Sequence, residues 1–527
     1  MNVPMLWTCL VAATSAAGAP LDSIPDFPSL LRNPPVWESG TVNASDSGFF
    51  ELGAGVEPLW AAGATQWFSG GFSGSGGWGG TGLIKVDARS RNQRWAVQCD
   101  ARHQRIPGVI GPWHALAYEW GVFDGWGRAY TPNLTSVAVT RFTGRVAHRL
   151  SPSMEVQAGM LEQHWGHGWR SVWWDRAAAP MPQVALHVDG ERVRYAHVIG
   201  SKRDWSAGSP PDVPGTDASA WAPWQYAERQ RSFLAAHMVS VDLGRGFQGT
   251  LFGAVTWLAQ DSGVVNRVEP AYFVPFVAFR PTEYRLGSAD NALIGMEGAW
   301  RSPDGRWLLS SQWLFDEWVT REMFGGEGWW ANKWASVNSV RWRQGDLACT
   351  LERAQVRPYT FSHAAPGTSW THDRSPIAHP NGANFIEWRV HGEGTWGPVR
   401  AHLGWTHLRQ GVEDVEAALE AGRSIISAPP AADFSLGTSP LVSYTQRPES
   451  YGIGAVYGGT GEMAEAGILT TQRVFADVDW AHERLGNARV FVRGAWRWAR
   501  AESGESAGWR RLEVGLRLQP ATEERDW

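Results

Sequence analysis

The sequence predicts an all-β protein: a single transmembrane antiparallel β-barrel of about eighteen strands, with about sixteen as the alternative. Three observations lead to this prediction. Polar and apolar residues alternate in runs long enough to cross a bilayer, tryptophan is unusually abundant, and the chain begins with an apolar segment typical of exported proteins. We expect long extracellular loops that partly plug the lumen.

The alternation is clearest near the C-terminus. Apolar side chains occupy every second position from Val474 to Trp480, with Asp477 between them, which places the two kinds of side chain on opposite faces of a strand. Each such run has about ten residues, enough to cross a bilayer at a tilt. A soluble β-sandwich would alternate in the same way and remains an alternative at this point. The three runs of this kind are residues 473–482, 489–498 and 511–519.

Composition favours the membrane barrel. The chain has 34 Trp and 60 Gly among 527 residues, and its mean hydropathy is only −0.29. Beyond the N-terminus no apolar run approaches the roughly 18 residues of a membrane helix, so a membrane protein with this sequence has to be a closed barrel. The net charge of −5 gives no basic footprint, so nucleic acid is not an expected partner.

Residues 1–19 resemble a secretory signal peptide, with small residues around Ala17 and Ala19 as cleavage sites. The Pro-rich residues 20–48 are predicted to form a periplasmic leader, and residues 49–527 the outer-membrane barrel. Of the three cysteines, Cys9 lies in the signal. Cys99 and Cys349 could pair in an oxidising compartment, but isolated thiols are the preferred expectation.

Strand-like runs recur along the rest of the chain and are separated by turn signals. We place them at residues 49–59, 82–87, 94–102, 136–149, 154–160, 193–200, 233–241, 249–258, 291–300, 307–318, 334–343, 346–356, 385–394, 399–408 and 451–457. Short turns alternate with long connections, as at the two ends of an outer-membrane barrel. The long connections are expected at 60–81, 103–133, 161–190, 201–229, 259–290, 319–333, 357–384 and 409–449, with a loop helix at 411–425.

The densest candidate for chemistry is the stretch 161–180. Its tryptophans and arginines offer flat aromatic faces beside hydrogen-bond donors, which suits a sugar ligand. His164 and His167, with Glu162 or Asp175, could instead hold a metal, but no framing motif supports this and no metal is predicted. The third alternative is a loop folded into the lumen, where these residues satisfy one another.

A second candidate is the stretch 271–295. Glu283 and Asp290 could form a glycosidase pair, yet with Arg280 and Arg285 beside them a charge network in the lumen is the preferred interpretation. The pair Asp316–Glu317 invites the same interpretation. The chain shows no nucleophile motif and no phosphate-binding loop. The protein is therefore not expected to be an enzyme, and no cofactor is expected.

Several of these segments resemble one family. Residues 163–171 with the following Asp-Arg-Ala-Ala-Ala-Pro, and residues 279–295, are similar to loops of the Wzi-like capsule-assembly outer-membrane proteins, a group that overlaps with RemB-like gliding-motility proteins. Asp316-Glu317 and the segments 328–333, 356–363 and 377–385 match further motifs in the same order. The resemblance covers roughly residues 80 to 410. Unlike the known capsule-anchoring members, this sequence has no helices long enough for a periplasmic bundle.

The resemblance implies a barrel in the outer membrane of a Gram-negative, Bacteroidetes-like bacterium that binds or organises capsular polysaccharide at the cell surface. The implied partners are outer-membrane lipid and surface polysaccharide, with other surface or motility proteins as further candidates. A gliding-motility or adhesion component and a solute channel are the alternative functions. The residues proposed to bind polysaccharide or to form a lumen network are His164, Trp165, His167, Trp169, Arg170, Trp173, Trp174, Arg280, Glu283, Tyr284, Asp290, Asn291, Asp316, Glu317, Trp329, Trp330, Lys333, Arg357, His379 and Asn381.

Overall fold

The computed structural model describes most of the chain from residue 49 to residue 518. The described residues are 49–66, 72–90, 92, 94–107, 122–123, 127–133, 136–206, 228–261, 264–265, 267–275, 278–288, 290–317, 330–415, 435–447, 467–481 and 488–518. The predicted signal peptide and leader lie outside them. So do Trp329, the strand expected at 451–457 and most of the helix expected at 411–425.

The described residues form one large antiparallel sheet, as predicted. Its long strands are β1 (Phe49–Gln66), β2 (Phe72–Arg89), β3 (Trp95–Pro107), β6 (Ser136–Ser151), β7 (Met154–Leu161), β8 (Met181–Asp189), β9 (Val193–Ser206), β10 (Glu228–Gly244), β11 (Phe247–Leu258), β14 (Asn291–Arg301), β15 (Trp307–Glu317), β16 (Lys333–Gln344), β17 (Leu347–Val356), β20 (Phe385–Trp396), β21 (Val399–Gly411), β22 (Ile468–Ala481), β23 (Ala488–Ala501) and β24 (Ser506–Leu518).

The smaller elements lie at or beyond the strand ends. The short strands β4 (Val122–Phe123) and β5 (Gly127–Asn133) pair with each other, and β5 pairs with β6. The remainder are β12 (Gln260–Asp261), β13 (Val264–Val265), β18 (Thr371–His372), β19 (Ser375–Pro376), the 3-10 helices η2 (Pro270–Phe273), η3 (Pro366–Thr368) and η5 (Tyr444–Gln446), and the helix α4 (Phe279–Leu286). Among the helices that the structure describes, none is both long and apolar enough to cross a bilayer.

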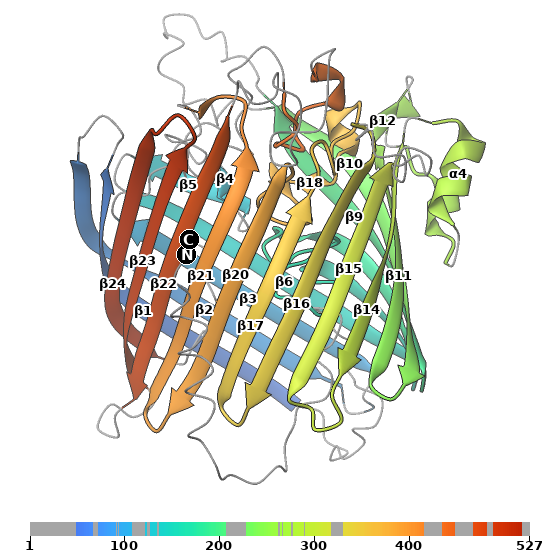
Figure 1. The fold of residues 1–527 in the computed structure, drawn as a ribbon. Coiled ribbons are helices and arrows are strands. Elements are labelled where there is room, and N and C mark those ends of the chain that lie inside the picture. Colours follow the sequence, from blue (N-terminus) through green and yellow to red (C-terminus); the bar gives the residue numbers. More distant parts are fainter. Residues whose placement is uncertain are drawn as a thin grey trace, which may run out of the picture.

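The strand pairings run in a ring. Each long strand pairs with the next one along the chain, and β1 also pairs with β24, from Val56 opposite Leu518 to Gln66 opposite Gly508. The sheet has twenty described strands; leaving out β4 and β5, eighteen follow one another around the ring. Figure 1 shows these strands tilted around a common interior, with short turns at one end and the longer connections at the other.

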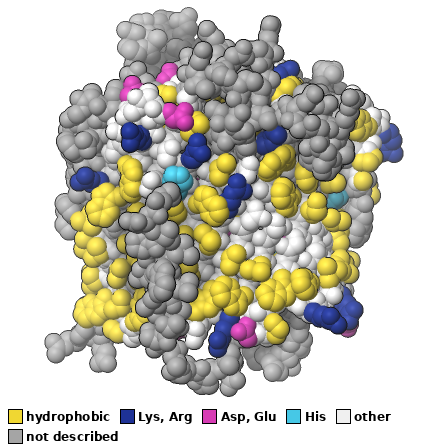
Figure 2. All heavy atoms as spheres, viewed as in Figure 1, with side chains coloured by type: hydrophobic (Ala, Val, Ile, Leu, Met, Phe, Trp, Pro, Cys, Tyr) yellow, Lys and Arg dark blue, Asp and Glu magenta, His cyan; other side chains and the backbone are white. Residues whose placement is uncertain are grey.

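The two faces of the ring differ in polarity. On β23, Val492 is 45% exposed whereas the adjacent Arg493 is only 6% exposed. The guanidinium of Arg493 lies inside, where it pairs with Asp477 at 2.9 Å and with Glu513 at 2.7 Å. Large apolar side chains cover the outward face, as Figure 2 shows for one side of the ring. This is the reverse of a soluble β-sandwich, which buries its apolar face between two sheets.

Two of the expected connections contain large parts of the long strands. The Gly-rich stretch 60–81, expected to be a loop, mostly belongs to β1 and β2, which pair from Phe49–Arg89 to Gln66–Phe72. Small residues such as Gly76 hide the period-two pattern, but they pair through the backbone just as well. The strand β8 lies within the expected loop 161–190. As expected, no disulfide joins Cys99 to Cys349, which lie on β3 and β17.

Candidate functional site

The stretch 162–180 connects β7 to β8 and lies within the ring; we call it the inner segment. Three inward side chains of the wall hold it: Glu297 of β14, Gln312 of β15 and Glu352 of β17. The Oε1 of Gln312 accepts hydrogen bonds from the Val172 N–H at 2.9 Å and the Ser171 hydroxyl at 3.0 Å. Its Nε2 donates to the Trp165 carbonyl at 2.8 Å. The amide of Gln312 therefore provides hydrogen-bond partners for backbone groups at two separate places in the inner segment.

The two glutamates act as acceptors for backbone N–H groups. Glu352 accepts from the N–H of Trp169 at 2.7 Å and of Arg170 at 3.1 Å. Glu297 accepts from the N–H of His167 at 2.9 Å, and its Oε1 lies 3.3 Å from the His167 ring. A buried irregular backbone has no strand partner for its N–H groups, so wall carboxylates satisfy these donors instead.

A buried ion pair fixes the middle of the inner segment. The Arg170 guanidinium pairs with Asp175 at 3.0 Å, and Asp175 also accepts from the Ser171 N–H at 2.8 Å and the Ala177 N–H at 2.8 Å. Burial by itself would raise the pKa of the Asp175 carboxyl, but the positive charge of Arg170 and the nearby histidines outweigh it and lower this pKa. The carboxylate is therefore held ionised as part of the fold.

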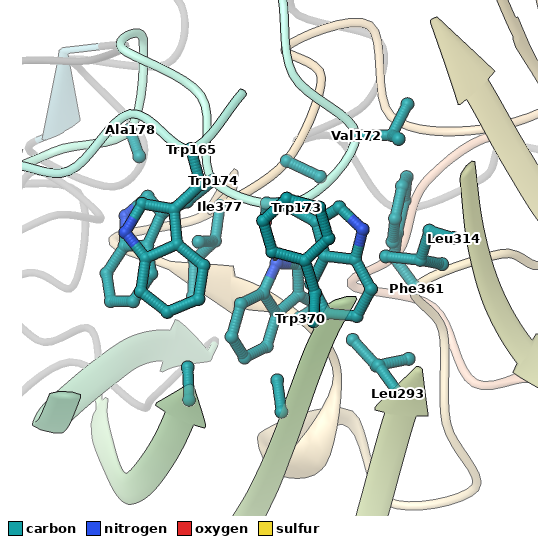
Figure 3. Packing of buried hydrophobic residues seen from close by; sticks show 14 of the residues in the cluster. Trp165, Val172, Trp173, Trp174, Ala178, Leu293, Leu314, Phe361, Trp370 and Ile377 are labelled. Carbon is teal, nitrogen blue, oxygen red and sulfur yellow. Dashed lines mark hydrogen bonds between the residues drawn. The ribbon is translucent and has the colours of Figure 1, made fainter. Parts of the chain in front are cut away.

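Three of the tryptophans proposed as polysaccharide-binding or lumen-network residues are buried in a core and are not exposed to a ligand. Trp165 and Trp173 stack on Phe252 with ring centroids 6.1 and 5.2 Å apart, and Trp174 meets Trp370 edge-on at 5.8 Å. Each of the three indoles of the inner segment is 1% exposed. Figure 3 shows them grouped with Trp370 and Ile377. These residues form the core inside the ring.

Residues 357–384, between β17 and β20, pack on the inner segment; we call them the covering segment. The Asp175 N–H donates to the Ile377 carbonyl at 2.8 Å, and Trp370 Nε1 donates to the Trp173 carbonyl at 2.7 Å. The wall fixes the covering segment too, because the buried Lys202 of β9 donates to the Ser369 carbonyl at 2.7 Å. The two segments therefore form one body inside the long-loop end of the ring.

The predicted residues of the covering segment are also part of this network. Asn381 donates to Glu387 of β20 at 2.8 Å, and the His379 ring lies 3.4 Å from the same carboxylate. Burial lowers the pKa of His379, although the charge of Glu387 acts in the opposite direction. The backbone of Arg357 donates to the Trp334 carbonyl at 3.0 Å.

A further group of side chains lies beyond this network and is partly exposed. We call Trp330, Lys333, Tyr444 and Arg447 the aromatic–basic cluster. Arg447 lies over the Trp330 ring at 3.8 Å, and the Trp330 and Tyr444 centroids are 5.7 Å apart. Lys333 lies 5.0 Å from the Tyr444 ring. Trp330, Tyr444 and Arg447 are partly open to solvent, so the cluster presents aromatic faces together with positive charge.

Two acidic residues neutralise the buried member of this cluster. Lys333 Nζ lies 3.2 Å from Asp316 and 3.4 Å from Glu317, and it also donates to the Ser362 carbonyl at 3.1 Å. Asp316 in turn accepts from the Phe361 N–H at 3.0 Å. Lys333 therefore joins the strand ends of β15 and β16 to the covering segment.

Trp169 is the partly exposed tryptophan of the inner segment. The Arg176 guanidinium lies 4.3 Å from its ring, and His391 of β20 lies 4.3 Å away on centroids. This is a second pairing of an aromatic face with a basic group, set within the ring.

The structure corrects one prediction: the stretch 271–290 does not form a charge network in the lumen. Phe279 of α4 and Tyr272 pack with Ala235, Trp257 and Ala292. Adjacent strand residues point to opposite faces, and Ala236 and Leu293 belong to the inner core with Trp165. The helix α4 therefore covers the outward face of the ring, beside β11 and β14 in Figure 1.

The predicted acidic residues of this region are paired outside the lumen or at its edge. Arg280 pairs with Glu283 at 3.1 Å, with the Tyr284 ring beside it. Asp290 pairs with Arg267 at 2.8 Å. Asn291 differs from them, because its side chain donates inward to the Thr368 carbonyl at 3.2 Å. Within the described part of the chain no group of three or more His, Cys, Asp and Glu residues is placed to hold a metal ion.

Sequence reasoning missed several residues that organise the site. Glu297, Gln312 and Glu352 lie on strands whose polar and apolar residues alternate, so the pattern predicts that they point inward. The pattern does not predict their hydrogen-bond partners in the inner segment. Tyr444 and Arg447 lie in a stretch without periodicity, and no signal connects them with Trp330.

No protein-family model and no characterised protein matches this sequence. Solved structures align over most of the chain. Wzi of Escherichia coli, described as a carbohydrate-binding β-barrel involved in group 1 capsule assembly, aligns with 8% identity and a TM-score of 0.46 over 86% of this chain and 84% of its own. OpdL of Pseudomonas aeruginosa aligns with 9% identity and a TM-score of 0.41 over 89% and 99%. OccAB4 of Acinetobacter baumannii aligns with 9% identity and a TM-score of 0.43 over 90% and 99%. Identities this low say nothing about function.

Proposed function

We propose that this protein is a non-enzymatic β-barrel of a Gram-negative outer membrane that binds or organises surface polysaccharide. Two features support the membrane placement. The outward face of the ring carries large exposed apolar side chains, among them Leu251, Trp388, Leu403 and Trp496. The charged side chains of the same strands point inward and pair with one another. A ring that leaves no strand edge unpaired also satisfies backbone groups within lipid.

The observation that carries the polysaccharide role is the aromatic–basic cluster at the long-loop end. Sugars present flat apolar faces ringed by hydroxyl groups, which suit an indole or phenol face beside hydrogen-bond donors. Trp330 and Tyr444 supply the faces, and Arg447 supplies the donors. The network of Lys333, Asp316 and the covering segment holds the cluster in place. The motifs similar to Wzi-like proteins support the same role.

The ion pairs of the acidic residues favour binding without catalysis. Glu283, Asp290, Asp316 and Glu317 are each paired with Arg280, Arg267 or Lys333 within 3.4 Å. Hydrolysis of a glycoside needs one carboxyl as acid and another as base or nucleophile at the same bond. Carboxylates committed to separate ion pairs are poorly placed for that chemistry.

A solute channel is the second candidate, and a specific observation favours it. The inward faces of β22, β23 and β24 carry charged residues that pair with one another, such as Asp477, Arg493 and Glu513. A polar wall of this kind lines the aqueous interior of outer-membrane channels. A gliding-motility or adhesion role rests on the resemblance alone.

The test is a binding measurement with purified full-length protein in detergent and the surface polysaccharide of the producing strain. We expect Trp330→Ala to weaken the Kd by about tenfold, because an aromatic face contributes on the order of 1 kcal/mol beyond the area it buries. Trp396→Ala is the matched control, since Trp396 is exposed on the strand adjoining a short turn. It should leave the Kd unchanged. No measurable affinity in the native protein, together with an unchanged capsule after gene deletion, would overturn the proposal.

A further inference from the structure

We propose that residues 267–275 and 278–288, which we call the outer-wall segment, lie at the surface of the outer leaflet and bind a phosphate group of its lipid through Arg285. This inference rests on the membrane placement proposed above and adds a lipid-binding site to it.

The outer-wall segment lies beside the long-loop ends of its strands. Tyr272 packs against Trp257 at 5.1 Å, and Trp257 is the residue before the end of β11. Phe279 stacks on His237, four residues along β10 from Phe233, the partner of Trp257. The segment thus spans about 13 Å of wall next to the strand ends. Aromatic residues at that level mark the border between hydrocarbon and headgroups in membrane proteins.

The segment is firmly attached to the wall. The Phe279 ring lies 4.4 Å from His237 at an interplanar angle of 15°, and 6.4 Å from His197. Both histidines point outward, so without this cover their polar rings would face lipid, which is costly. At the other end of the segment, Asp290 pairs with Arg267 at 2.8 Å and accepts from the Tyr272 hydroxyl at 2.9 Å. The segment is therefore a fixed part of the wall.

The side chains that the segment leaves exposed are mainly apolar. Val268, Phe273 and Val274 are exposed, and Tyr284 is 73% exposed. On the wall next to the segment, Ile294 of β14 is also exposed and continues the same apolar surface. An exposed apolar surface joined to the lipid-facing wall is stable where it meets acyl chains.

The charges of the segment leave one guanidinium available for an external anion. Arg267 pairs with Asp290 and lies 3.7 Å from Glu269, and Arg280 pairs with Glu283. Among the described residues no carboxylate pairs with Arg285, which is exposed near the end of α4. Guanidinium groups bind phosphate with two parallel hydrogen bonds, and Tyr284 beside it supplies an interfacial ring. Charge and position together favour a lipid phosphate.

The experiment is native mass spectrometry of the full-length protein in detergent, titrated with bis-phosphorylated lipid A or with the same lipid after phosphate removal. We expect the native protein to bind the phosphorylated lipid about tenfold more tightly than the dephosphorylated one. Arg285→Ala should remove that preference. Arg306→Ala is the control, because Arg306 is exposed in the turn between β14 and β15 at the opposite end of the wall. It should retain the preference.

Two results would overturn the inference that Arg285 binds a lipid phosphate. Equal affinity of the native protein and Arg285→Ala for the phosphorylated lipid would show that Arg285 binds no phosphate. A dimer that Tyr284→Ser or Arg285→Ala dissociates would identify a second copy of the chain as the occupant. Sedimentation of the protein with outer membranes separates the two proposals. A protein absent from that fraction refutes the membrane placement, whereas a membrane protein without the phosphate preference refutes the lipid site alone.

Discussion

Single side chains of the wall determine the path of the inner segment. Glu297, Gln312 and Glu352 belong to three different strands, yet each accepts hydrogen bonds from backbone N–H groups between residues 167 and 172. Leaving a buried N–H donor without an acceptor costs more free energy than a formed hydrogen bond contributes to stability. The wall therefore selects one conformation of a loop that has no regular secondary structure.

Replacing Gln312 by Leu tests this at one position. The change leaves the buried Val172 N–H without its acceptor and removes one of the two donors to the Trp165 carbonyl, which keeps the Ser171 hydroxyl at 2.6 Å. We therefore expect the free energy of unfolding to fall by about 2 kcal/mol. Denaturant unfolding in detergent, followed by tryptophan fluorescence, measures it. Ser311→Ala is the control, since the Ser311 hydroxyl donates to Asn338 and makes no hydrogen bond to the inner segment; the loss there should stay below about 1 kcal/mol. Equal losses in both variants would contradict the role of Gln312.

At the scale of the element, strand direction was predictable and the placement of the connections was not. Alternation correctly put Val492 outside and Arg493 inside, because side chains on a strand alternate strictly. Opposite charges predicted a network of Arg280 and Glu283 in the lumen, whereas the helix α4 that carries them packs on the outward face through Phe279. In a membrane barrel the outward face is itself apolar, so an apolar connection can pack on either side. Hydrophobicity alone cannot choose between them.

Two further misses have their own causes. The strand β8 begins with Met181-Pro182, and because proline is unusual within a sheet, this start hides the strand within the loop expected at 161–190. Tyr444 and Arg447 lie more than a hundred positions from Trp330 and meet it only through the folded covering segment. A local sequence pattern cannot predict a contact between residues so far apart in the chain.

The covering segment should lose stability in mild acid. Burial, aided by the charge of Lys333, lowers the pKa of His363 from 6.5 to about 4. The unfolded segment therefore binds a proton more readily than the folded one. Its stability is complete above pH 6.5 and falls as the pH drops toward 4. We expect hydrogen exchange, corrected for intrinsic rates, to show opening of residues 357–384 easier by up to about 2 kcal/mol at about pH 5 than at pH 7.5.

His363→Gln is the matched variant, because its amide can still contact Thr368, the partner of the His363 ring at 2.7 Å. The acid effect should shrink in this variant but not vanish, since burial also lowers the pKa of His372 and His379. An identical pH dependence in the two proteins would exclude His363 as its source.

At the scale of the molecule, the described residues line different parts of the ring with different chemistry. The inner segment meets the wall from β11 to β20, through Phe252, Glu297, Glu352 and His391. Further around the ring, Arg493 of β23 pairs with Asp477 and Glu513. One part of the described interior is a packed core, and another part is a charged wall. This arrangement separates the two functional candidates: the core supports the binding surface, whereas the charged wall resembles that of a channel.

Conductance in planar bilayers distinguishes a polysaccharide-binding protein with an obstructed interior from a solute channel. The inner and covering segments pack together inside the ring through the Asp175–Ile377 and Trp370–Trp173 hydrogen bonds, so we expect the native protein to pass little current. Replacing residues 166–174 by a Gly-Ser linker removes Arg170, Trp173 and the contacts to Gln312, and should raise the single-channel conductance by about tenfold if that segment is the obstruction. The same linker inserted in the turn at Asp304 serves as the control, because that turn joins β14 and β15 at the other end of the ring. Native protein that already conducts as well as the linker variant would refute an obstructing core, and the charged wall of β22 to β24 would then line an open path.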